Sequence, residues 1–271
     1  MSVIVGLAGA WILILVGMLL KGGSIMGVLN LPAFLMVIGG TVGALIASFG
    51  LKPVMSMFSL TTKVAMRERP DTRPDTIRTL VGYSEKARRE GLLVLEEDAR
   101  TAEDPYLARG VRLVVDGTDP ELVKDIMETE LDAMEDRHKR NQKLFDQGGA
   151  FAPTIGIMAT VLSLVSVLQH LDKPETLGPA ISAAFLATFY GVAIANVMYF
   201  PVANALKTRT AQEIDERTLI MEGVLSIQSG DNPRILAEKL WSFLPPAQRP
   251  AGATEDDAAP SGARDRLAEA A

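Results

Sequence analysis

Four stretches of the chain are built almost entirely from apolar residues, and polar sequence separates them. They cover residues 3–20, 31–50, 150–169 and 178–206, and none contains Asp, Glu, Lys or Arg. Each is close to or above the length that crosses about 30 Å of hydrocarbon as a helix. A cleaved signal peptide is a poor alternative for the first stretch, because no basic residue precedes it and its apolar part is long. The pattern predicts four transmembrane helices.

The segment between the second and third stretches, residues 51–149, carries most of the charge of the chain. Lys52 and Lys63 follow the second stretch, and Lys207 and Arg209 follow the fourth. Basic residues close to the ends of membrane helices favour the cytoplasmic side. We therefore expect residues 51–149 and both termini to be cytoplasmic.

This polar segment has the spacing of helices. One helix is predicted to begin at Asp119, an N-cap residue followed by Pro120 at the first helical position. Its apolar face is marked by residues three or four apart, namely Val123, Met127, Leu131 and Met134. We expect this helix to continue past Leu144 towards the third apolar stretch. Residues 75–100 indicate another pair of amphipathic turns.

The predicted fold is an all-α membrane protein with four transmembrane helices and a large helical cytoplasmic domain between spans two and three. Residues 212–229 and 233–244 are expected to form two short helices after the fourth span. The expected organisation is: transmembrane helices one and two in 1–50, the cytoplasmic helical domain in 51–149, transmembrane helices three and four in 150–207, C-terminal cytoplasmic helices in 208–244, and a disordered tail in 245–271.

Composition excludes several kinds of chemistry. The chain has no cysteine, and its two histidines, His138 and His170, lie too far apart to suggest a metal site. No nucleophile with a base, no phosphate-binding loop and no basic face with aromatic residues is present, so we predict neither an enzyme nor a nucleic-acid-binding protein. The apolar stretches contain no carboxylate, so they cannot carry a proton relay by themselves.

Prolines and hydroxyl groups interrupt the third and fourth stretches. Pro153 and Pro201 both lie near the cytoplasmic face, and we expect them to lie at a similar depth. As a pair they favour a movable cytoplasmic end of the two spans. Pro153 alone also fits a simple helix start. Thr160 and Thr188 each lie about ten residues into a span, and with Tyr190 they offer oxygens to a cation near the midplane. The alternative is that each threonine only bonds the carbonyl four residues back in its own helix.

A cluster of charges marks the cytoplasmic segment. Arg88 and Arg89 are followed by Glu96 and Glu97, so basic residues give way to acidic ones within ten positions. Such a run fits either a solvated surface or a docking surface for a partner of complementary charge.

Several segments together resemble one family. The motifs FAPTIGI, TVLSLV, LGPAISAAFLATFYGVAIAN and FPVANALK of the two last spans resemble the MotA/PomA flagellar stator subunits of the MotA/TolQ/ExbB family. The motifs LPAFLMVIGGT and ARREGLLVLEE are similar to further signatures of that family. The likeness extends to about Leu244 and keeps the order of the motifs. It implies a multi-pass protein of the bacterial inner membrane.

The resemblance implies roles for the residues already singled out. Arg88 and Glu96, with Arg89 and Glu97 beside them, correspond to the charges that contact the rotor protein FliG in the family. Pro153 and Pro201 correspond to the prolines that couple ion flow to movement. Together with Thr160, Thr188 and Tyr190 of the ion path, these residues form the candidate site.

The same resemblance bears on the ion. Thr160 and Thr188 match the threonines of sodium-type members, which favours Na⁺ over H⁺ as the transported ion. We expect no cofactor. Two departures weaken the preference for Na⁺. Asn30 stands where sodium-type members carry an Asp, and Ala159 and Ser163 replace glycines that are common in the third-span motif of the family.

The missing carboxylate would come from a partner. In the family, a single-span, peptidoglycan-binding subunit of the MotB/PomB type supplies an ion-binding Asp, and five copies of a chain like this one surround two partner helices. The alternatives are an energiser of envelope transport like TolQ or ExbB, and a five-subunit ion-driven motor in another process such as phage defence. Four spans and the motif ARREGLLVLEE favour the flagellar stator.

Overall fold

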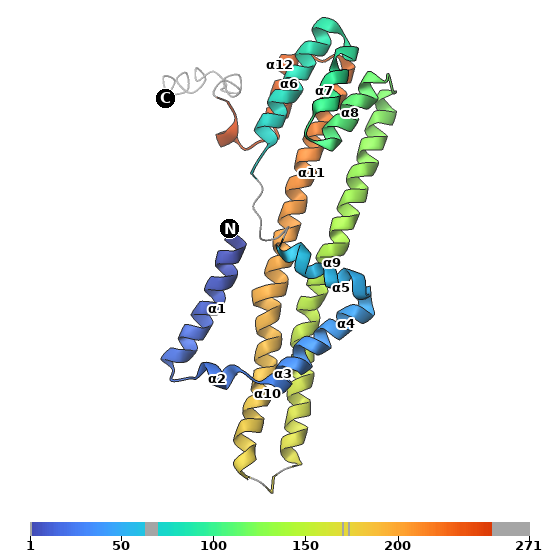
Figure 1. Ribbon diagram of the computed structural model, residues 1–271. Helices are drawn as coiled ribbons and strands as arrows, with labels where there is room; N and C mark the ends of the chain where they lie inside the picture. The colour runs from blue at the N-terminus through green and yellow to red at the C-terminus, as the bar shows by residue number, and fades with distance from the viewer. Residues whose placement is uncertain (1, 63–69, 170, 173, 251–271) are drawn as a thin grey trace, which may run out of the picture. The chain divides into compact units, whose positions relative to one another are not determined.

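The computed structural model describes residues 2–62, 70–169, 171–172 and 174–250 (Figure 1). Over these residues the chain is helical and forms no strand, which confirms the all-α class. Of the predicted disordered tail 245–271, residues 251–271 lie outside the described residues, whereas Pro246–Gln248 form a 3₁₀ turn. His170 lies outside them too.

The elements follow one another with short connections. In chain order they are α1 (Ser2–Leu20), α2 (Ile25–Val28), α3 (Leu31–Phe34), the π-helical turn η1 (Leu35–Gly39), α4 (Gly40–Phe49), α5 (Leu51–Leu60), α6 (Arg73–Glu90), the 3₁₀ turn η3 (Leu92–Val94), α7 (Leu95–Thr101), α8 (Pro105–Val115), α9 (Pro120–Leu168), α10 (Pro174–Ile194), the π-helical turn η4 (Ala195–Tyr199), α11 (Phe200–Ser229), α12 (Pro233–Trp241) and the 3₁₀ turn η5 (Pro246–Gln248).

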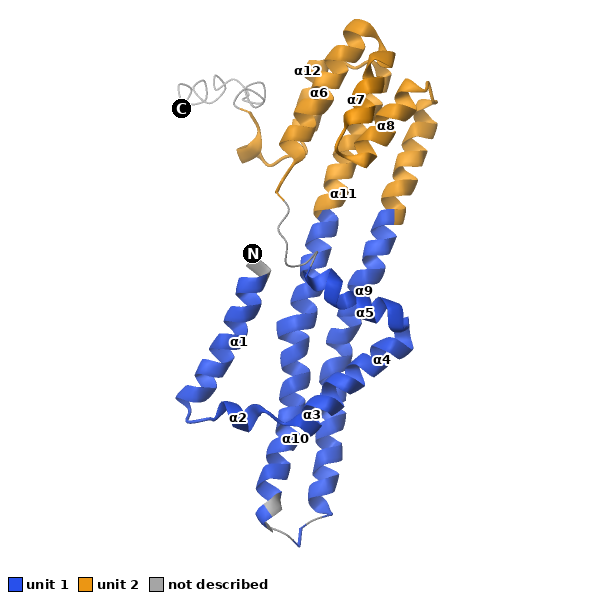
Figure 2. Ribbon diagram, in the orientation of Figure 1, with its two compact units in different colours: residues 1–69, 134–211 blue, residues 70–133, 212–271 orange. Residues whose placement is uncertain are grey.

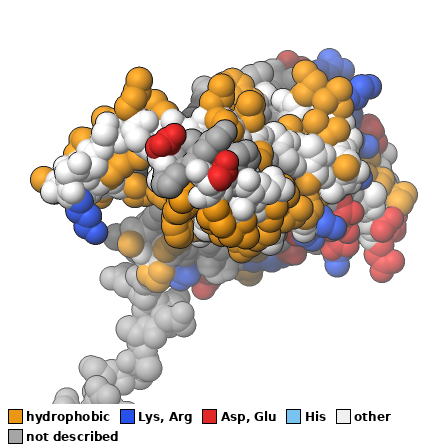
Figure 3. Space-filling view, turned by 90° about the horizontal axis from the view of Figure 1, so that it is seen from below, with side chains coloured by type: hydrophobic (Ala, Val, Ile, Leu, Met, Phe, Trp, Pro, Cys, Tyr) orange, Lys and Arg blue, Asp and Glu red, His pale blue; other side chains and the backbone are white. Residues whose placement is uncertain are grey.

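Three of the helical stretches in the described residues are long and apolar enough to cross a membrane: Leu31–Phe49, Pro120–Leu168 and Leu177–Ser229. The apolar part of α1, Ile4–Leu20, is shorter. Many large apolar side chains on α9 and α10 are exposed, and Figure 3 shows hydrophobic side chains over much of the surface seen from below. A surface of this kind suits lipid, and the chain is a membrane protein.

The chain divides into two compact units, coloured separately in Figure 2. Unit 1 contains residues 1–69 and 134–211, and unit 2 contains residues 70–133 and 212–271. Helices α9 and α11 each contribute residues to both units, because the division falls inside them.

Unit 1 is built on α9 and the helical run from α10 to α11. Its larger buried cluster includes Leu45, Phe145, Val202 and Leu206. Polar contacts join α9 to α11 beyond this cluster. Gln142 Nε2 donates to Thr210 Oγ1 at 2.8 Å, and Lys207 Nζ lies 2.9 Å from Asp146.

Unit 2 has its own apolar core, to which α6, α8, α11 and α12 contribute. Its fully buried side chains include Leu80, Leu219 and Leu236. Tyr106 lies in this core, where its hydroxyl donates to the carbonyl of Met127 at 3.0 Å. Burial of the phenol raises its pKa to about 12.

The helix predicted from Asp119 is present, because Asp119 Oδ1 accepts from the backbone N–H of Glu121 at 2.9 Å and α9 runs unbroken to Leu168. The separate helix predicted for 212–229 is instead the continuation of α11, which begins at Phe200. No helix-breaking residue stands between the apolar and polar parts of α11, so the helix continues across the change in polarity. The structure adds α5, which begins after Gly50 turns the chain with φ +85°.

Candidate functional site

The backbones of α9 and α10 touch at a pair of glycines. A Cβ atom on Gly156 would lie 2.9 Å from the carbonyl oxygen of Ala187 and 3.3 Å from Cα of Gly191. A Cβ on Gly191 would overlap the carbonyl oxygen of Ala152. Small residues let membrane helices approach this closely, and close approach strengthens their van der Waals contact. This contact fixes how far apart the two helices lie at the level of the threonines.

The structure brings Thr160 and Thr188 together, one turn along α9 from Gly156. Their hydroxyl oxygens are 2.6 Å apart. Thr160 Oγ1 also lies 3.0 Å from the carbonyl oxygen of Gly156 and 2.8 Å from that of Ala184. Each threonine therefore does more than bond its own helix.

This oxygen cluster is short of protons. Thr160 Oγ1 makes three close oxygen contacts, and the two threonine hydroxyls carry one proton each. If Thr188 donates to Thr160, the Thr160 proton is either shared between the carbonyl oxygens of Gly156 and Ala184 or leaves one of them without a donor. A cation or a donated proton would stabilise such an arrangement. The group is half-buried and sits between helices without any ionised side chain in their apolar stretches.

Tyr190 uses its hydroxyl elsewhere. The hydroxyl donates to the carbonyl of Val28 and accepts from the backbone N–H of Asn30 at 3.0 Å. Asn30 in turn caps α3, since its Oδ1 accepts from Ala33 N at 3.0 Å. The tyrosine ring packs edge-on against Phe34, with 6.2 Å between the centroids. Tyr190, which lies two residues after Thr188, therefore binds the connection between α2 and α3 to α10.

The two prolines sit in different helical surroundings. Pro153 lies inside α9, which continues unbroken. Pro201 is the second residue of α11 and follows the π-helical turn of residues 195–199. Proline cannot donate a backbone hydrogen bond, and its ring presses on the carbonyl four residues earlier, which here is Val197. The π-helical turn of residues 195–199 contains Val197, so the helix is widened at the residue whose carbonyl the proline ring contacts.

The prolines also lie at different levels. Thr160 and Thr188 are level with one another, since their hydroxyls touch. Pro153 is seven residues from Thr160, whereas Pro201 is thirteen residues from Thr188. Six residues of α-helix rise about 9 Å. The expectation of similar depth is therefore wrong, because the fourth apolar stretch extends further beyond the threonine pair on this side than the third does.

The candidate rotor charges are all exposed side chains of unit 2. Arg88 and Arg89 stand in the last turn of α6, and Glu96 and Glu97 stand in the first turn of α7, where the helix dipole favours acids. Lys86 of α6 forms an ion pair of 2.8 Å with Asp98 of α7. The hydrogen bond to Asp98 raises the pKa of Lys86. This pair joins the basic part of the surface to the acidic part.

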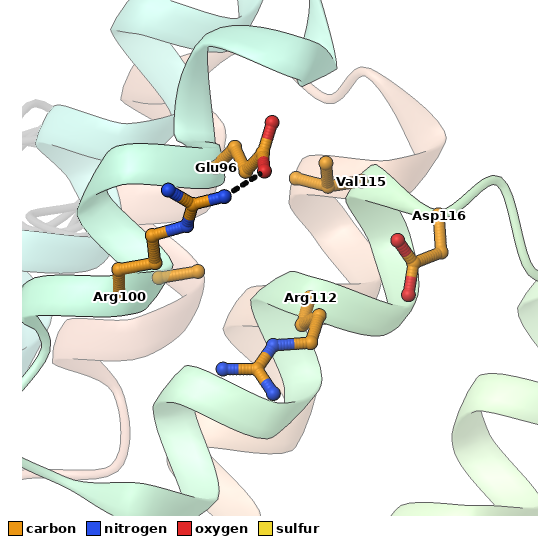
Figure 4. A pocket seen from close by; sticks show the side chains of 6 residues that line it. Glu96, Arg100, Arg112, Val115 and Asp116 are labelled. Carbon is orange, nitrogen blue, oxygen red and sulfur yellow. Dashed lines mark hydrogen bonds and ion pairs between the residues drawn. The ribbon is translucent and has the colours of Figure 1, made fainter.

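Glu96 lines a hollow of about 250 Å³ between α7 and α8. Its carboxylate accepts from Arg100 at 2.6 Å, and Arg112, Val115 and Asp116 line the hollow from the side of α8 (Figure 4). The Glu96 and Arg100 side chains are 60% and 64% exposed, so their pairing contributes about 0–1 kcal/mol. Glu96 is therefore available to exchange Arg100 for a partner group.

No group of three His, Asp or Glu side chains in the described ranges is placed to hold a metal ion. The chemistry available here is that of hydroxyl and carbonyl oxygens inside the helix pair, and of exposed charges on unit 2. Neither arrangement supplies a nucleophile next to a base.

Comparison with known proteins identifies the family. Residues 98–218 match the model of the MotA/TolQ/ExbB proton channel family. Motility protein A of Bacillus subtilis (strain 168) is 37% identical to this chain over 246 residues, which is 91% of each protein. The chain belongs to the MotA/TolQ/ExbB family.

Solved structures of family members agree with the fold. A structure of C. jejuni MotAB gives a TM-score of 0.85 at 30% identity and covers 92% of this chain and 97% of that chain. The flagellar MotAB stator complex from Bacillus subtilis gives a TM-score of 0.84 at 36% identity and covers 91% and 97% respectively. The resemblance inferred from the sequence motifs is thereby confirmed.

The match to the family model separates the two parts of the candidate site. Residues 98–218 include both threonines and both prolines, whereas Arg88, Arg89, Glu96 and Glu97 precede this range. The helix pair therefore lies within the part of the chain that matches the family model. The exposed charges lie in sequence that the family model does not match.

Proposed function

We propose that this chain is a stator subunit of the bacterial flagellar motor, which converts an ion-motive force into torque on the rotor. The observation that carries the proposal is the similarity to the flagellar MotAB stator complex from Bacillus subtilis over nearly the whole length of both chains. The paired threonines between α9 and α10 supply an oxygen cluster for the ion.

The proposed topology has four spans in the bacterial inner membrane. Helix α1 forms the first span, and the apolar parts of the candidate spanning helices Leu31–Phe49, Pro120–Leu168 and Leu177–Ser229 form the others. The domain organisation is then 1–50, 51–149, 150–207, 208–244 and 245–271, as the sequence suggests. Basic residues flank the spans at Lys52 and Lys207, which supports a cytoplasmic position for unit 2 and both termini.

The ion path needs a second protein. None of the proposed spans contains a carboxylate, so the binding charge comes from a single-span partner of the MotB/PomB type that carries an Asp and binds peptidoglycan. Five copies of this chain surround two partner helices. Thr160 and Thr188 face the ion as it meets the partner Asp, and Tyr190 supports that wall. The two threonine hydroxyls and the backbone carbonyls beside them form a group of oxygen ligands such as a bound Na⁺ requires, which supports Na⁺ over H⁺ as the transported ion.

Movement follows from ion binding at this wall. Neutralising the partner Asp changes the packing of the helix pair, and Pro153 and Pro201 are the points where α9 and α11 bend. The exposed charges Arg88, Arg89, Glu96 and Glu97 then push against the rotor protein FliG. The chain acts as a mechanical and ion-conducting subunit and has no enzymatic role.

A complementation experiment tests the proposal. The chain and its genomic partner are expressed in a flagellated host that lacks its own stator, and swimming speed is measured as external sodium is varied at constant ionic strength. We expect swimming that rises with sodium. Swimming that ignores sodium would remove the sodium assignment, and no swimming despite normal membrane levels of both proteins would contradict the stator role.

A further inference from the structure

One face of the helical run from α10 into the π-helical turn is exposed over residues 181–196, and it carries two polar side chains. The exposed residues are Ile181, Phe185, Val192 and Asn196, and the half-buried Thr188 lies between them. At about 100° per residue these five positions fall within about 80° of one another. The face that bears Thr188 therefore also bears Asn196, about 12 Å further along the helix.

Asn196 uses only one of the two polar atoms of its amide. Its Nδ2 donates to the carbonyl of Val192 at 2.9 Å. Its Oδ1 receives no hydrogen bond from any described residue. Asn196 lies inside the apolar stretch 178–206, which forms the fourth span in the proposed topology. A polar group that faces hydrocarbon without a partner is costly, so we expect a group other than lipid to meet this oxygen.

The main chain of the same residue offers a second acceptor. The N–H of Phe200 donates to the carbonyl of Ala195, five residues back, as in a π-helix. By the same pattern the carbonyl of Asn196 would accept from residue 201, but Pro201 has no N–H to donate. The helix therefore leaves two oxygens of Asn196, Oδ1 and the main-chain oxygen, without donors.

These oxygens suit a cation that travels along this face. Residues 178–206 contain no basic side chain that could pair with them. Thr188, on the same face, belongs to the proposed ion path, and the cytoplasmic end of the span lies beyond Asn196. An ion that leaves the threonine pair on this side therefore passes Asn196 before it reaches the cytoplasm.

We propose that Asn196 forms a second cation site, to which Na⁺ binds after it leaves Thr160 and Thr188. The two oxygens of Asn196 bind the ion, and water supplies its other ligands. The inference rests on the proposed function and adds a ligand to the ion path. It also gives Pro201 a chemical effect besides bending, because the missing N–H keeps the carbonyl of Asn196 available.

The test measures swimming speed against external sodium for the full chain, expressed with its partner in the host without a stator. Asn196→Leu removes the amide and approximately keeps its size. Loss of one contact with a charge slows a step by about tenfold, so the speed at saturating sodium should fall severalfold. The sodium concentration for half-maximal speed should not rise, since both threonines are intact. The control Asn204→Leu removes an exposed amide three residues before Lys207 and should swim normally.

Asn196→Asp separates ion binding from a structural role. Aspartate keeps the oxygen, loses the Nδ2 that donates to Val192 and adds a negative charge. A cation site would then hold Na⁺ more tightly, so the sodium concentration for half-maximal speed should fall by about tenfold, and the saturating speed should fall with it. If only the hydrogen bond to Val192 matters, the Asp and Leu variants would behave alike at every sodium concentration, which would overturn the inference.

A measurement on purified stator complexes decides if Asn196→Asp does not reach the membrane. Replacing choline chloride by sodium chloride at equal ionic strength should raise the unfolding temperature of the unsubstituted complex more than that of Asn196→Leu. Equal shifts, or normal swimming of Asn196→Leu, would overturn the inference and leave the stator role standing. If the unsubstituted chain restores no swimming, the proposed function fails, whereas the difference in sodium shift still supports or refutes the cation site.

Discussion

The hydroxyl oxygens of Thr160 and Thr188 lie 2.6 Å apart across the α9–α10 pair, within reach of two backbone carbonyls. Neither side chain could reach the other if the helices were a few ångströms further apart. Their distance is set by Gly156 and Gly191, where the two backbones meet. The oxygen cluster of the proposed ion path therefore depends on helix packing as much as on the threonines.

Removing the Thr160 hydroxyl while keeping the shape of the side chain should weaken ion binding. A contact between a neutral polar group and a charge is worth about 1.5–3 kcal/mol, and about 1.4 kcal/mol is tenfold in affinity. In Thr160→Val, the sodium concentration that gives half-maximal swimming speed should rise about tenfold or more. Thr160→Ser should remain close to the unsubstituted chain. The control is Thr154→Val, since among the described residues the Thr154 hydroxyl bonds only the carbonyl of Phe151. Equal effects of the two valine substitutions would count against the ion path.

Replacing Pro201 by alanine should abolish rotation and leave assembly intact. Alanine restores the backbone N–H and removes the pressure on Val197, so the π-helical turn of residues 195–199 can relax to a regular α-helix. Pro153→Ala should give the same phenotype. Swimming of tethered or free cells and recruitment of fluorescent complexes to the motor measure the two properties. Pro179→Ala, in the interior of α10, is the matched control and should swim normally.

Adding a methyl group at Gly191 should separate α9 from α10. The new Cβ would overlap the carbonyl oxygen of Ala152, and backbone cannot move aside as a flexible side chain does. Overpacking of this kind costs about 1–3 kcal/mol, so the detergent-purified complex should unfold at lower temperature and swimming should be lost. Gly178→Ala provides the control, because no described atom lies within 4 Å of its added Cβ. Equal melting temperatures of the two variants would contradict the close contact.

Removing the Tyr190 hydroxyl should loosen the connection between α2 and α3. Tyr190→Phe keeps the ring against Phe34 but leaves the carbonyl of Val28 and the N–H of Asn30 without their partner. We expect faster hydrogen exchange in residues 28–33 and lower thermal stability, by about 1–3 kcal/mol for the groups left unpaired. Tyr199→Phe is the control, since the Tyr199 hydroxyl bonds no described residue. Unchanged exchange in residues 28–33 would show that the hydroxyl does not hold this connection.

Unit 2 should lose stability in alkali through Tyr106. Burial raises the pKa of this phenol from its ordinary value of 10.0 to about 12. The folded chain thus holds the neutral form to higher pH than the unfolded chain does. The contribution of neutral Tyr106 to the free energy of unfolding is full below about pH 10 and is lost as the pH rises from about 10 towards 12.

Tyr106→Phe separates this effect from packing. The variant loses the hydrogen bond to Met127 at every pH, about 0.5–1.5 kcal/mol, but its unfolding midpoint should fall less steeply between pH 10 and 12. Circular dichroism during urea unfolding of the purified protein measures both the free energy of unfolding and the change of the unfolding midpoint with pH. Parallel pH curves for the two proteins would refute the assignment.

Long-range periodicity in the sequence predicted the helices well where the pattern was strong. The N-cap Asp119 and the apolar residues that follow it located the start of α9, and its continuation past Leu144 is confirmed. The boundary predicted after the fourth span is absent because apolar and polar residues can share one helix. A change of polarity marks a change of surroundings and does not mark the end of a helix.

The contacts of the candidate site were only partly predictable. Thr160 and Thr188 could be singled out, because hydroxyls are conspicuous in an apolar stretch. The hydroxyl of Tyr190 could not be assigned to Val28 and Asn30, since these partners lie about 160 positions away in sequence. The glycine contact left a readable signal, with Ala152, Gly156 and Thr160 spaced four apart, but that spacing did not reveal which helix it meets.

The π-helical turn of residues 195–199 has one more consequence. Such a turn encloses one residue more than an α-helical turn, and each residue rotates an α-helix by about 100°. Shortening this stretch by one residue would leave a continuous helix but swing Thr188 about a quarter of the way around its axis relative to α11. The hydroxyl would leave Thr160 although every residue of the wall was unchanged. The length of this short stretch therefore decides whether the two threonine hydroxyls of the proposed ion path can meet.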